Sequence, residues 1–291
     1  MLQQTQVKTV IPYFLKVTKR FKTLRSFSKC TESEILKLWE GLGYYRRARN
    51  LLKTSKILTK KYNSRLPKTI EQIKNLPGVG NYTASALLGL VHDKPVIAID
   101  GNVKRVFSRI INRQVNKIDF DKFVEVNNEK LFGSKRNSDL VEGLMEFGAL
   151  ICKPKNPICN GCNLKKNCKY FKSSNKIRNT KIRMIKNKNY DVFCYINKKK
   201  QIALKKNNEL GFLSKFSLPE IRETKNNNIN NSWKFLKSYR NNISNKKLNI
   251  NLYYKFSDKI PSSFNWYSLE KNEEFIPTFT KKIFRQVSIL F

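Results

Sequence analysis

The sequence predicts two domains, an all-α region over residues 1–172 and an α+β region over residues 189–291. Apolar residues recur at helical spacing through the first region, where no convincing strand pattern occurs. Segments with alternating apolar and polar residues begin only after a polar, basic stretch at 173–188, which has the composition of a linker. A chain of 291 residues is long enough for each domain to have its own core.

The helical pattern divides the first domain into consecutive segments. Residues 2–22 form the first helix, and residues 31–39 form the second, which opens with a capping box of Thr31 and Glu34. A basic helix follows over residues 44–61. Further helices are expected over residues 69–76, 82–88, 102–111, 121–131 and 138–150.

The second domain mixes the two periodicities. Strands are expected over residues 190–197, 201–206 and 248–256. Helices are expected over residues 231–240 and 278–290, with Pro277 placed to start the last one.

The net charge of the chain is +38, from 59 Lys and Arg residues against 21 Asp and Glu residues. Such a field favours a polyanionic partner, and nucleic acid is the obvious one. Part of the lysine excess has a compositional origin, because the chain is also rich in Asn and Ile, whose codons are A/T-rich like those of Lys. The sequence shows no signal peptide and no membrane-length apolar run, so no membrane partner is expected. We further expect a monomer in the bacterial cytoplasm.

Four of the six cysteines gather at residues 152–168 in the spacing C-x6-C-x2-C-x5-C. They are Cys152, Cys159, Cys162 and Cys168. Four thiolates on a short loop suit a tetrahedral metal ion or an iron–sulfur cluster. Only one C-x2-C pair is present and the gaps are unequal, which favours a 4Fe-4S cluster over a structural zinc. A disulfide is a weaker alternative, because Cys30 and Cys194 stand isolated.

Two further motifs precede the cysteines. The segment Leu76-Pro-Gly-Val-Gly80 lies between two helices, where glycines allow positive φ and the next helix offers free amides to a phosphate. An ordinary helix–helix turn is equally compatible with it. Asp100, in Ile99-Asp-Gly-Asn-Val-Lys-Arg105, ends an apolar segment and either caps the next helix or carries chemistry.

The order of hairpin, aspartate and cysteine loop over residues 1–170 resembles the helix–hairpin–helix DNA glycosylase superfamily. Within it, Met1-Leu-Gln-Gln-Thr-Gln-Val7 and Trp39-Glu-Gly-Leu-Gly-Tyr-Tyr-Arg-Arg-Ala-Arg-Asn50 resemble the adenine DNA glycosylase family (MutY type). The family removes adenine mispaired with 8-oxoguanine after flipping the nucleotide out of the duplex. The resemblance therefore implies double-stranded DNA with A:8-oxoguanine or A:G mispairs as partner and a 4Fe-4S cluster on the four cysteines.

The resemblance also implies roles for individual residues. Asp100 would be the carboxylate that stabilises or captures the oxocarbenium ion. Gln4 and Tyr44 would be wedges in the base stack, with Leu42 in support. Further DNA contacts are expected at Gly78, Gly80, Tyr82, Asn102 and Lys104.

The sister family, endonuclease III, needs a lysine amine just after the hairpin to form a Schiff base with the sugar. Tyr82 stands at that position, so the resemblance implies a monofunctional enzyme. Lys104 could in principle supply the amine, but nothing in the sequence argues for this role. The family's general acid is a glutamate whose position would precede Met1. Two expectations compete: the reading frame begins upstream and supplies it, or the chain is a catalytically impaired protein that binds the lesion.

The second domain resembles the Nudix-like C-terminal domain of the same family, which reads the 8-oxoguanine. The segment Gly211-Phe-Leu-Ser-Lys-Phe-Ser-Leu-Pro219 matches weakly, and only Glu220 and Glu223 follow it, so no Mg²⁺-binding Nudix box is expected. Ser244 maps to the family's Phe-Ser-His recognition motif, and Asn245 replaces its histidine.

Overall fold

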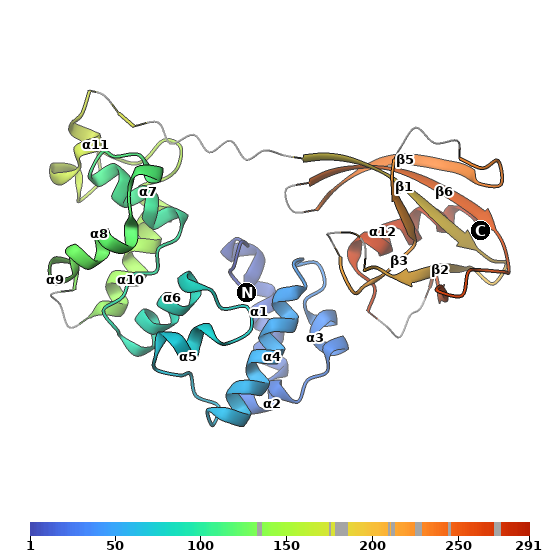
Figure 1. Ribbon diagram of the computed structural model, residues 1–291, viewed down its shortest axis with the longest axis horizontal. Coiled ribbons are helices and arrows are strands. Elements are labelled where there is room, and N and C mark those ends of the chain that lie inside the picture. The colour runs from blue at the N-terminus through green and yellow to red at the C-terminus, as the bar shows by residue number, and fades with distance from the viewer. Residues whose placement is uncertain are drawn as a thin grey trace. The chain divides into compact units, whose positions relative to one another are not determined.

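The computed structural model describes residues 1–132, 136–174, 176–177, 186–208, 210, 213–224, 229–243, 246–270 and 275–291. The chain divides into two compact units. One unit comprises Met1–Val17, Thr31–Tyr45 and Ile182–Phe291, and the other comprises Thr18–Cys30 and Arg46–Lys181. Figure 1 shows helices α1 to α11 in blue to yellow-green, and the strands and α12 in yellow to red.

Helices account for the regular structure of the described residues before residue 172, and no strand occurs among them, as the sequence pattern predicts. They are α1 (Val7–Arg20), α2 (Leu24–Ser28), α3 (Glu32–Leu38), α4 (Arg46–Lys61), α5 (Ile70–Lys74), α6 (Asn81–His92), α7 (Gly101–Ile110), α8 (Phe120–Val126), α9 (Asn128–Leu131), α10 (Asn137–Glu146) and α11 (Lys169–Lys172). The short helix α2 was not expected, and the helix expected over residues 121–131 is divided into α8 and α9. Helix α10 continues into a π-helical turn, Phe147–Ile151, which leads directly into the cysteine loop.

Local capping explains where several of these helices begin. The Thr31 hydroxyl accepts the Glu34 N–H at 3.2 Å, and the Glu34 carboxylate accepts the Thr31 N–H at 2.9 Å, so the expected capping box at α3 is confirmed. Thr69 caps α5 and Asp100 caps α7 in the same way, through side-chain oxygens that accept backbone N–H groups of the first turn.

The helices that surround Asp100 are tied together by buried apolar contacts. One cluster, Ile97, Val103, Phe107 and Phe120, joins the start of α7 to α8. A second cluster, Ile73, Ala84 and Leu88, joins α5 to α6. Helices α6 and α10 approach closely at Gly89, where an added Cβ would lie 2.7 Å from a Val141 methyl group. The hairpin, α7 and the cysteine loop therefore belong to one packed body.

The second domain contains a seven-stranded sheet. Its strands are β1 (Lys186–Ile196), β2 (Gln201–Lys206), β3 (Ser217–Leu218), β4 (Glu220–Glu223), β5 (Lys234–Ile243), β6 (Lys246–Phe256) and β7 (Asn265–Ser268). The main order is β3-β2-β1-β6-β5, with β4 on β1 and β7 on β2. Strands β1 and β6 are parallel, and β5 is antiparallel to β6.

Helix α12 (Thr278–Val287) covers one face of this sheet, and Phe279, Ile283 and Phe284 join strand residues in its core. Strand β1 begins at Lys186, within the stretch expected to be a linker. The expected strands over residues 201–206 and 248–256 and the expected C-terminal helix are confirmed.

The helix expected over residues 231–240 is wrong, because Lys234–Ile243 forms strand β5. A register shift between Phe235 and Lys237 interrupts its alternation. As a result Leu236, Tyr239 and Ile243 all reach the core face at spacings of three and four residues. That spacing imitates a helical stripe in the sequence.

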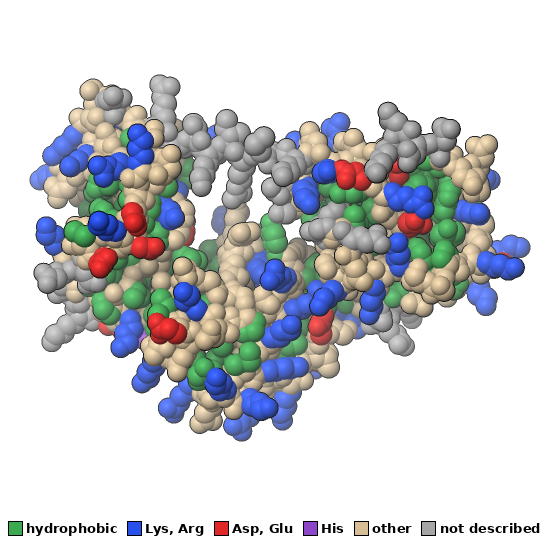
Figure 2. Space-filling view, in the orientation of Figure 1, with side chains coloured by type: hydrophobic (Ala, Val, Ile, Leu, Met, Phe, Trp, Pro, Cys, Tyr) green, Lys and Arg blue, Asp and Glu red, His purple; other side chains and the backbone are tan. Residues whose placement is uncertain are grey.

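Lys and Arg side chains (blue in Figure 2) greatly outnumber Asp and Glu side chains (red) on the face shown, over the helices and over the sheet alike. Among the residues that the structure describes, no helix has the length and apolar character needed to cross a bilayer.

Candidate active site

The Asp100 carboxylate sits at the N-terminus of α7 and is held by two donors. Its Oδ1 accepts the Val103 N–H at 2.7 Å, and its Oδ2 accepts the Asn102 side-chain amide at 2.9 Å. The residue is half-buried. A carboxylate fixed at the positive end of a ten-residue helix is oriented and ready to meet a developing positive charge.

Tyr82, from the first turn of α6, lies beside this carboxylate. Burial raises the pKa of Tyr82, and the negative charge of Asp100 raises it further. Its hydroxyl points to the Met145 sulfur at 3.8 Å, and 39% of the residue is exposed. Tyr82 is therefore a neutral phenol within reach of the Asp100 charge, and its hydroxyl is directed to Met145.

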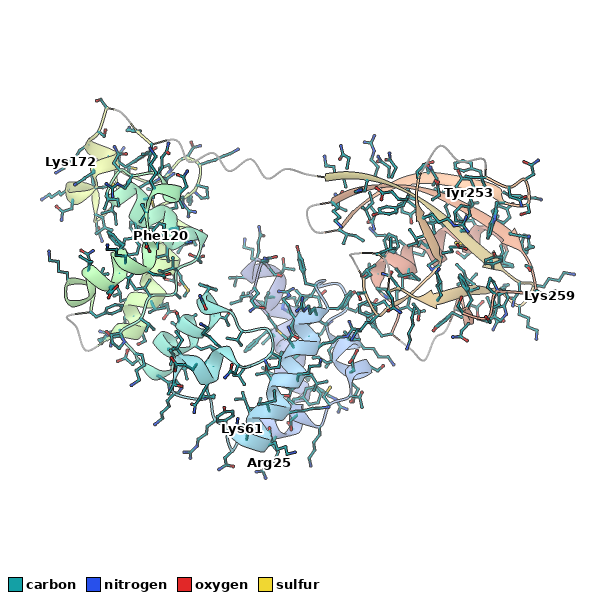
Figure 3. All side chains as sticks on the ribbon, viewed as in Figure 1. Arg25, Lys61, Phe120, Lys172, Tyr253 and Lys259 are labelled. Atoms are coloured by element: carbon teal, nitrogen blue, oxygen red, sulfur yellow. The ribbon has the colours of Figure 1, made fainter. Side chains whose placement is uncertain are left out.

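The ammonium of Lys104 is turned toward a different neighbour. It lies over the ring of Phe120, 5.3 Å from the centroid, where the π face attracts it. Figure 3 labels Phe120 beside α7 in the helical part of the chain. Lys104 is thus held by α8 rather than aimed at Asp100.

The turn Leu76–Gly80 is shaped by one of its two glycines. Gly78 has φ +80°, and a Cβ there would lie 2.5 Å from the Asn50 side-chain nitrogen on α4. The Thr54 hydroxyl, also on α4, donates to the Pro77 carbonyl at 3.2 Å. Gly80 instead has φ −99° and forms the N-cap of α6. Gly78 must therefore be glycine, because its φ is positive and a Cβ would collide with Asn50. Gly80 meets neither condition.

Gly80 leaves the start of α6 open. Its own conformation is extended, a Cβ there would meet nothing within 4 Å, and within the described part of the chain no side chain caps the helix. Among the described residues the start of α6 therefore lacks a side-chain cap, which is compatible with an anion-binding hairpin.

Arg105, one turn after Asp100, connects this site to the cysteine loop. Its Nη2 donates to the Asn102 side-chain oxygen at 3.0 Å and to the Gly148 carbonyl at 2.6 Å, and its Nε donates to the Cys152 carbonyl at 2.9 Å. Since the Asn102 amide also donates to Asp100, a continuous chain of hydrogen bonds joins Cys152 to the carboxylate.

Arg109, one further turn along α7, holds the start of the loop. It is only 9% exposed, and it donates to the carbonyls of Lys153 at 2.7 Å and Pro154 at 3.0 Å. Its Nη1 also lies 3.3 Å from both the carbonyl oxygen and the sulfur of Cys152. The guanidinium thus satisfies loop carbonyls that have no strand or helix to bond to.

The four expected ligand cysteines line one cavity with an empty volume of about 370 Å³, counting the part that opens to solvent. Burial raises the pKa of Cys159, and the charges of Cys152, Cys168 and Cys162 raise it further, so the four thiols are neighbours. The rest of the lining is mostly apolar, including Val106, Phe147, Ile151, Leu164 and Tyr170. Among the described residues no group of three or more His, Cys, Asp or Glu side chains is arranged to hold a single metal ion. Four thiol donors around an apolar hollow suit a thiophilic group larger than one ion.

Gln4, Leu42 and Tyr44 belong to the other unit. Both residues expected to act as wedges are exposed and have left-handed backbones, with φ 57° at Gln4 and φ 49° at Tyr44. Such conformations are strained in residues other than glycine and concentrate at functional sites. Leu42 is only 6% exposed, so it can support its turn from beneath but does not project from it.

The turn that carries Tyr44 is rigid. Buried Trp39 donates its indole N–H to the Gly43 carbonyl at 3.0 Å. Gly41 has φ +95°, and a Cβ there would lie 2.5 Å from the Tyr13 hydroxyl of α1. Tyr44, 46% exposed, is therefore presented from a fixed backbone.

Ser244 and Asn245 lie outside the described residues, as do Gly211 and Phe212. Ser244 and Asn245 lie in the chain between the described ends of β5 and β6. The sequence reasoning did not identify Arg105, Arg109 or Gly148. The two arginines lie four residues apart on one helix face, and only this spacing could have indicated them. The many other basic residues of the chain hide that signal.

Comparisons with known proteins agree with this geometry. Residues 1–130 match the model of the HhH-GPD superfamily of base excision DNA repair proteins. An adenine DNA glycosylase of Buchnera aphidicola subsp. Baizongia pistaciae (strain Bp) is 35% identical over an alignment 308 positions long, which covers 99% of this chain and 87% of that protein.

Two solved structures share the fold of the helical part. A thermostable thymine-DNA glycosylase has a TM-score of 0.52 and 30% identity, over 59% of this chain and 80% of its own. An endonuclease III, solved in a non-covalent complex with DNA, has a TM-score of 0.50 and 26% identity, over 59% of this chain and 79% of its own.

The hairpin, the aspartate at the start of α7 and the matched superfamily define a DNA glycosylase of base excision repair, a DNA-binding enzyme with a helix–hairpin–helix fold followed by a β-sheet domain. Within that class the chain belongs to the adenine DNA glycosylase family, whose activity is the hydrolysis of N-glycosyl bonds.

Proposed function

We propose that this chain removes adenine paired with 8-oxoguanine or guanine in duplex DNA, and that it does so without cleaving the strand. The observation that carries the proposal is that Tyr82, whose pKa burial and the charge of Asp100 raise, is a phenol and not an amine. A carboxylate stands at the start of α7, and the neighbouring position on α6 offers a neutral phenol in place of an amine.

Asp100 is proposed as the catalytic carboxylate. As the C1′–N9 bond breaks, adenine takes its electrons and must gain a proton, while positive charge develops on the sugar, where the carboxylate stabilises that ion or captures it. In the net reaction water supplies both parts, its hydroxyl to C1′ and its proton to the departing adenine. Asn102 is placed to keep the carboxylate in position, because its amide donates to Asp100 while its own oxygen accepts from Arg105.

A lyase reaction would require an amine that attacks C1′ and forms an imine. Tyr82 cannot form one, and the Lys104 ammonium lies over Phe120 instead. These two observations support a monofunctional enzyme.

The four cysteines are proposed to hold a 4Fe-4S cluster. The donor chemistry fits, because all four thiols border one apolar hollow. The loop that the cluster would hold carries Lys153, Lys155, Lys165 and Lys166, and these lysines would then meet phosphates.

DNA contacts are proposed for elements of each unit, taken separately. Gly78, Gly80 and the first amides of α6 suit a phosphate, with Asn102 and Lys104 on α7 nearby in the chain. Gln4 and Tyr44 are proposed as wedges in the base stack, and buried Leu42 supports the turn of Tyr44.

We further propose the division into a glycosylase region at 1–172, a linker at 173–188 and a Nudix-like domain at 189–291 that reads the lesion. A mixed sheet covered by α12 is compatible with that domain type. Ser244 is proposed to contact the 8-oxoguanine.

The test is a single-turnover assay on matched duplexes with adenine opposite 8-oxoguanine, guanine or thymine. Adenine should leave the first two duplexes faster than the third, and the strand should break only after alkali. Borohydride should trap no covalent adduct, whereas Tyr82→Lys serves as a positive control for trapping. An adduct trapped with the unaltered chain would contradict the monofunctional assignment.

A further inference from the structure

The face of the sheet opposite α12 carries a continuous group of aromatic rings. Strands β4, β1, β6 and β5 lie side by side, and their alternate residues point away from the α12 core. Six rings are in mutual contact on this face, which we call the ring surface: Phe193, Tyr195, Trp233, Phe235, Tyr253 and Phe264. Figure 3 labels Tyr253 on the sheet.

The rings form a graded surface rather than a closed core. Phe193 is 5% exposed and stacks on Tyr253 with centroids 5.4 Å apart and planes at 19°. Phe235 meets Tyr253 edge-on at 5.5 Å and is 57% exposed. The buried rings thus give a stiff base, and Phe235 offers an open aromatic face on top of it. If these rings formed a second hydrophobic core, Phe235 would be buried, but it is exposed.

Cations border the ring surface, and the Glu220 and Asp191 carboxylates near it are hydrogen-bonded within the sheet. The Arg222 guanidinium lies 5.1 Å from the Phe193 centroid, and the Lys205 ammonium lies 5.6 Å from that of Phe264. The Glu220 carboxylate is bonded by Arg222 at 2.7 Å, and the Asp191 carboxylate accepts the Asn251 amide at 2.9 Å. An acidic peptide would use only the charges, and a neutral apolar peptide would use only the rings. A polyanion that carries flat π-systems would use both.

We propose that the ring surface binds unpaired bases of single-stranded DNA. Aromatic side chains on an open sheet face stack bases that are not enclosed in a duplex, and neighbouring cations meet the phosphates. Stacking needs free base faces, so paired DNA is not the ligand of this surface. The proposal does not depend on glycosylase chemistry, because it concerns a different part of the chain and a strand that contains no adenine.

The test uses the full chain and two labelled probes, a thymidine strand of about 15 nucleotides, matched to known single-strand site sizes, and a strand of equal length made of abasic sites. Fluorescence anisotropy at moderate salt limits the binding due to phosphates alone. The unaltered chain should prefer the thymidine strand. Phe235→Ala should weaken thymidine binding about tenfold and leave abasic binding unchanged, because stacking on one ring is lost.

Two variants act as controls. Phe235→Tyr should keep the preference, since an aromatic face remains. Phe256→Ala removes a ring of similar exposure, 51%, that contacts Tyr254 and Phe291 instead of the ring surface, and it should behave like the unaltered chain. Equal affinity of the unaltered chain for both strands, or an undiminished preference in Phe235→Ala, would overturn the proposal. An equal loss in Phe256→Ala would overturn it as well.

Discussion

Gly148→Ala tests whether the cysteine-loop entry positions the active site. A Cβ at residue 148 would lie 2.8 Å from the Asn102 Cβ and 3.3 Å from the Asn102 carbonyl carbon. The second atom belongs to the backbone of α7, so the contact cannot be relieved by rotating a side chain. Overpacking of this kind costs about 1–3 kcal/mol, while Ala in place of Gly within a helix returns about 0.5–1 kcal/mol. The net loss is then about 0–2.5 kcal/mol, centred near 1 kcal/mol, and 1 kcal/mol corresponds to roughly 3 °C in melting temperature for a unit of this size.

The matched control is Gly143→Ala on α10, where a Cβ would meet nothing within 4 Å. That variant should gain about 1 kcal/mol from helix propensity alone. Both variants are compared by thermal unfolding and by adenine release under single-turnover conditions. Because the strain at Gly148 falls on Asn102, which holds Asp100, release should slow roughly tenfold in Gly148→Ala only. Equal stability and equal rates in the two variants would refute the positioning argument.

Three other predictions follow from single contacts. Arg109→Met should speed iron loss to a chelator by at least about tenfold, since one hydrogen bond from a charged donor contributes about 1.5–3 kcal/mol. The control, Arg113→Met at an exposed residue nearby, should lose iron at the rate of the unaltered chain. An equally stable iron centre in Arg109→Met would contradict the role of Arg109. Tyr239→Phe should raise the free energy of unfolding by about 1 kcal/mol, because the buried phenol oxygen finds no hydrogen-bond partner among the described residues; destabilisation in a denaturant titration would contradict this. Burial raises the pKa of Tyr190, Tyr195, Tyr239 and Tyr253 above the usual value of 10.0, so the folded state keeps protons that the unfolded chain releases. The free energy of unfolding of the sheet domain should therefore be at its full value below pH 10.0 and fall as pH rises above it. The fall should be less steep in Tyr239→Phe. A flat profile between about pH 9 and 11 would contradict the burial of these phenols.

Local signals in the sequence predicted much of the fold. The capping box at Thr31, the apolar spacing of the helices and the alternation of residues 248–256 each depend on neighbours in the chain, and each was confirmed. Strand β5 could not be predicted in this way, because its register shift gives Leu236, Tyr239 and Ile243 helical spacing and only pairing with β6 decides the outcome. Tertiary context overrides local propensity in such segments.

The candidate site shows the same division. The sequence indicated Asp100 and the four cysteines through residue type and spacing. It did not indicate that Asn102 and Arg105 would join them, because that chain of hydrogen bonds depends on the Gly148 and Cys152 carbonyls, which the fold brings to α7. The glycines of the turn also differ in a way that no motif shows, since only Gly78 has positive φ and a blocked Cβ position.

The central claim, that Asp100 acts through its charge and is not merely a helix cap, is tested most directly by Asp100→Asn. Asparagine caps helices about as well as aspartate, so α7 should keep its start while the negative charge is lost. Asp119→Asn provides the control, because Asp119 caps α8 through the same type of bond, to the Lys122 N–H at 3.2 Å. In single-turnover assays on an A:8-oxoguanine duplex, Asp100→Asn should abolish adenine release with duplex affinity retained, and Asp119→Asn should match the unaltered chain. Adenine release by Asp100→Asn at the unaltered rate would show that Asp100 is only a cap and would contradict the account.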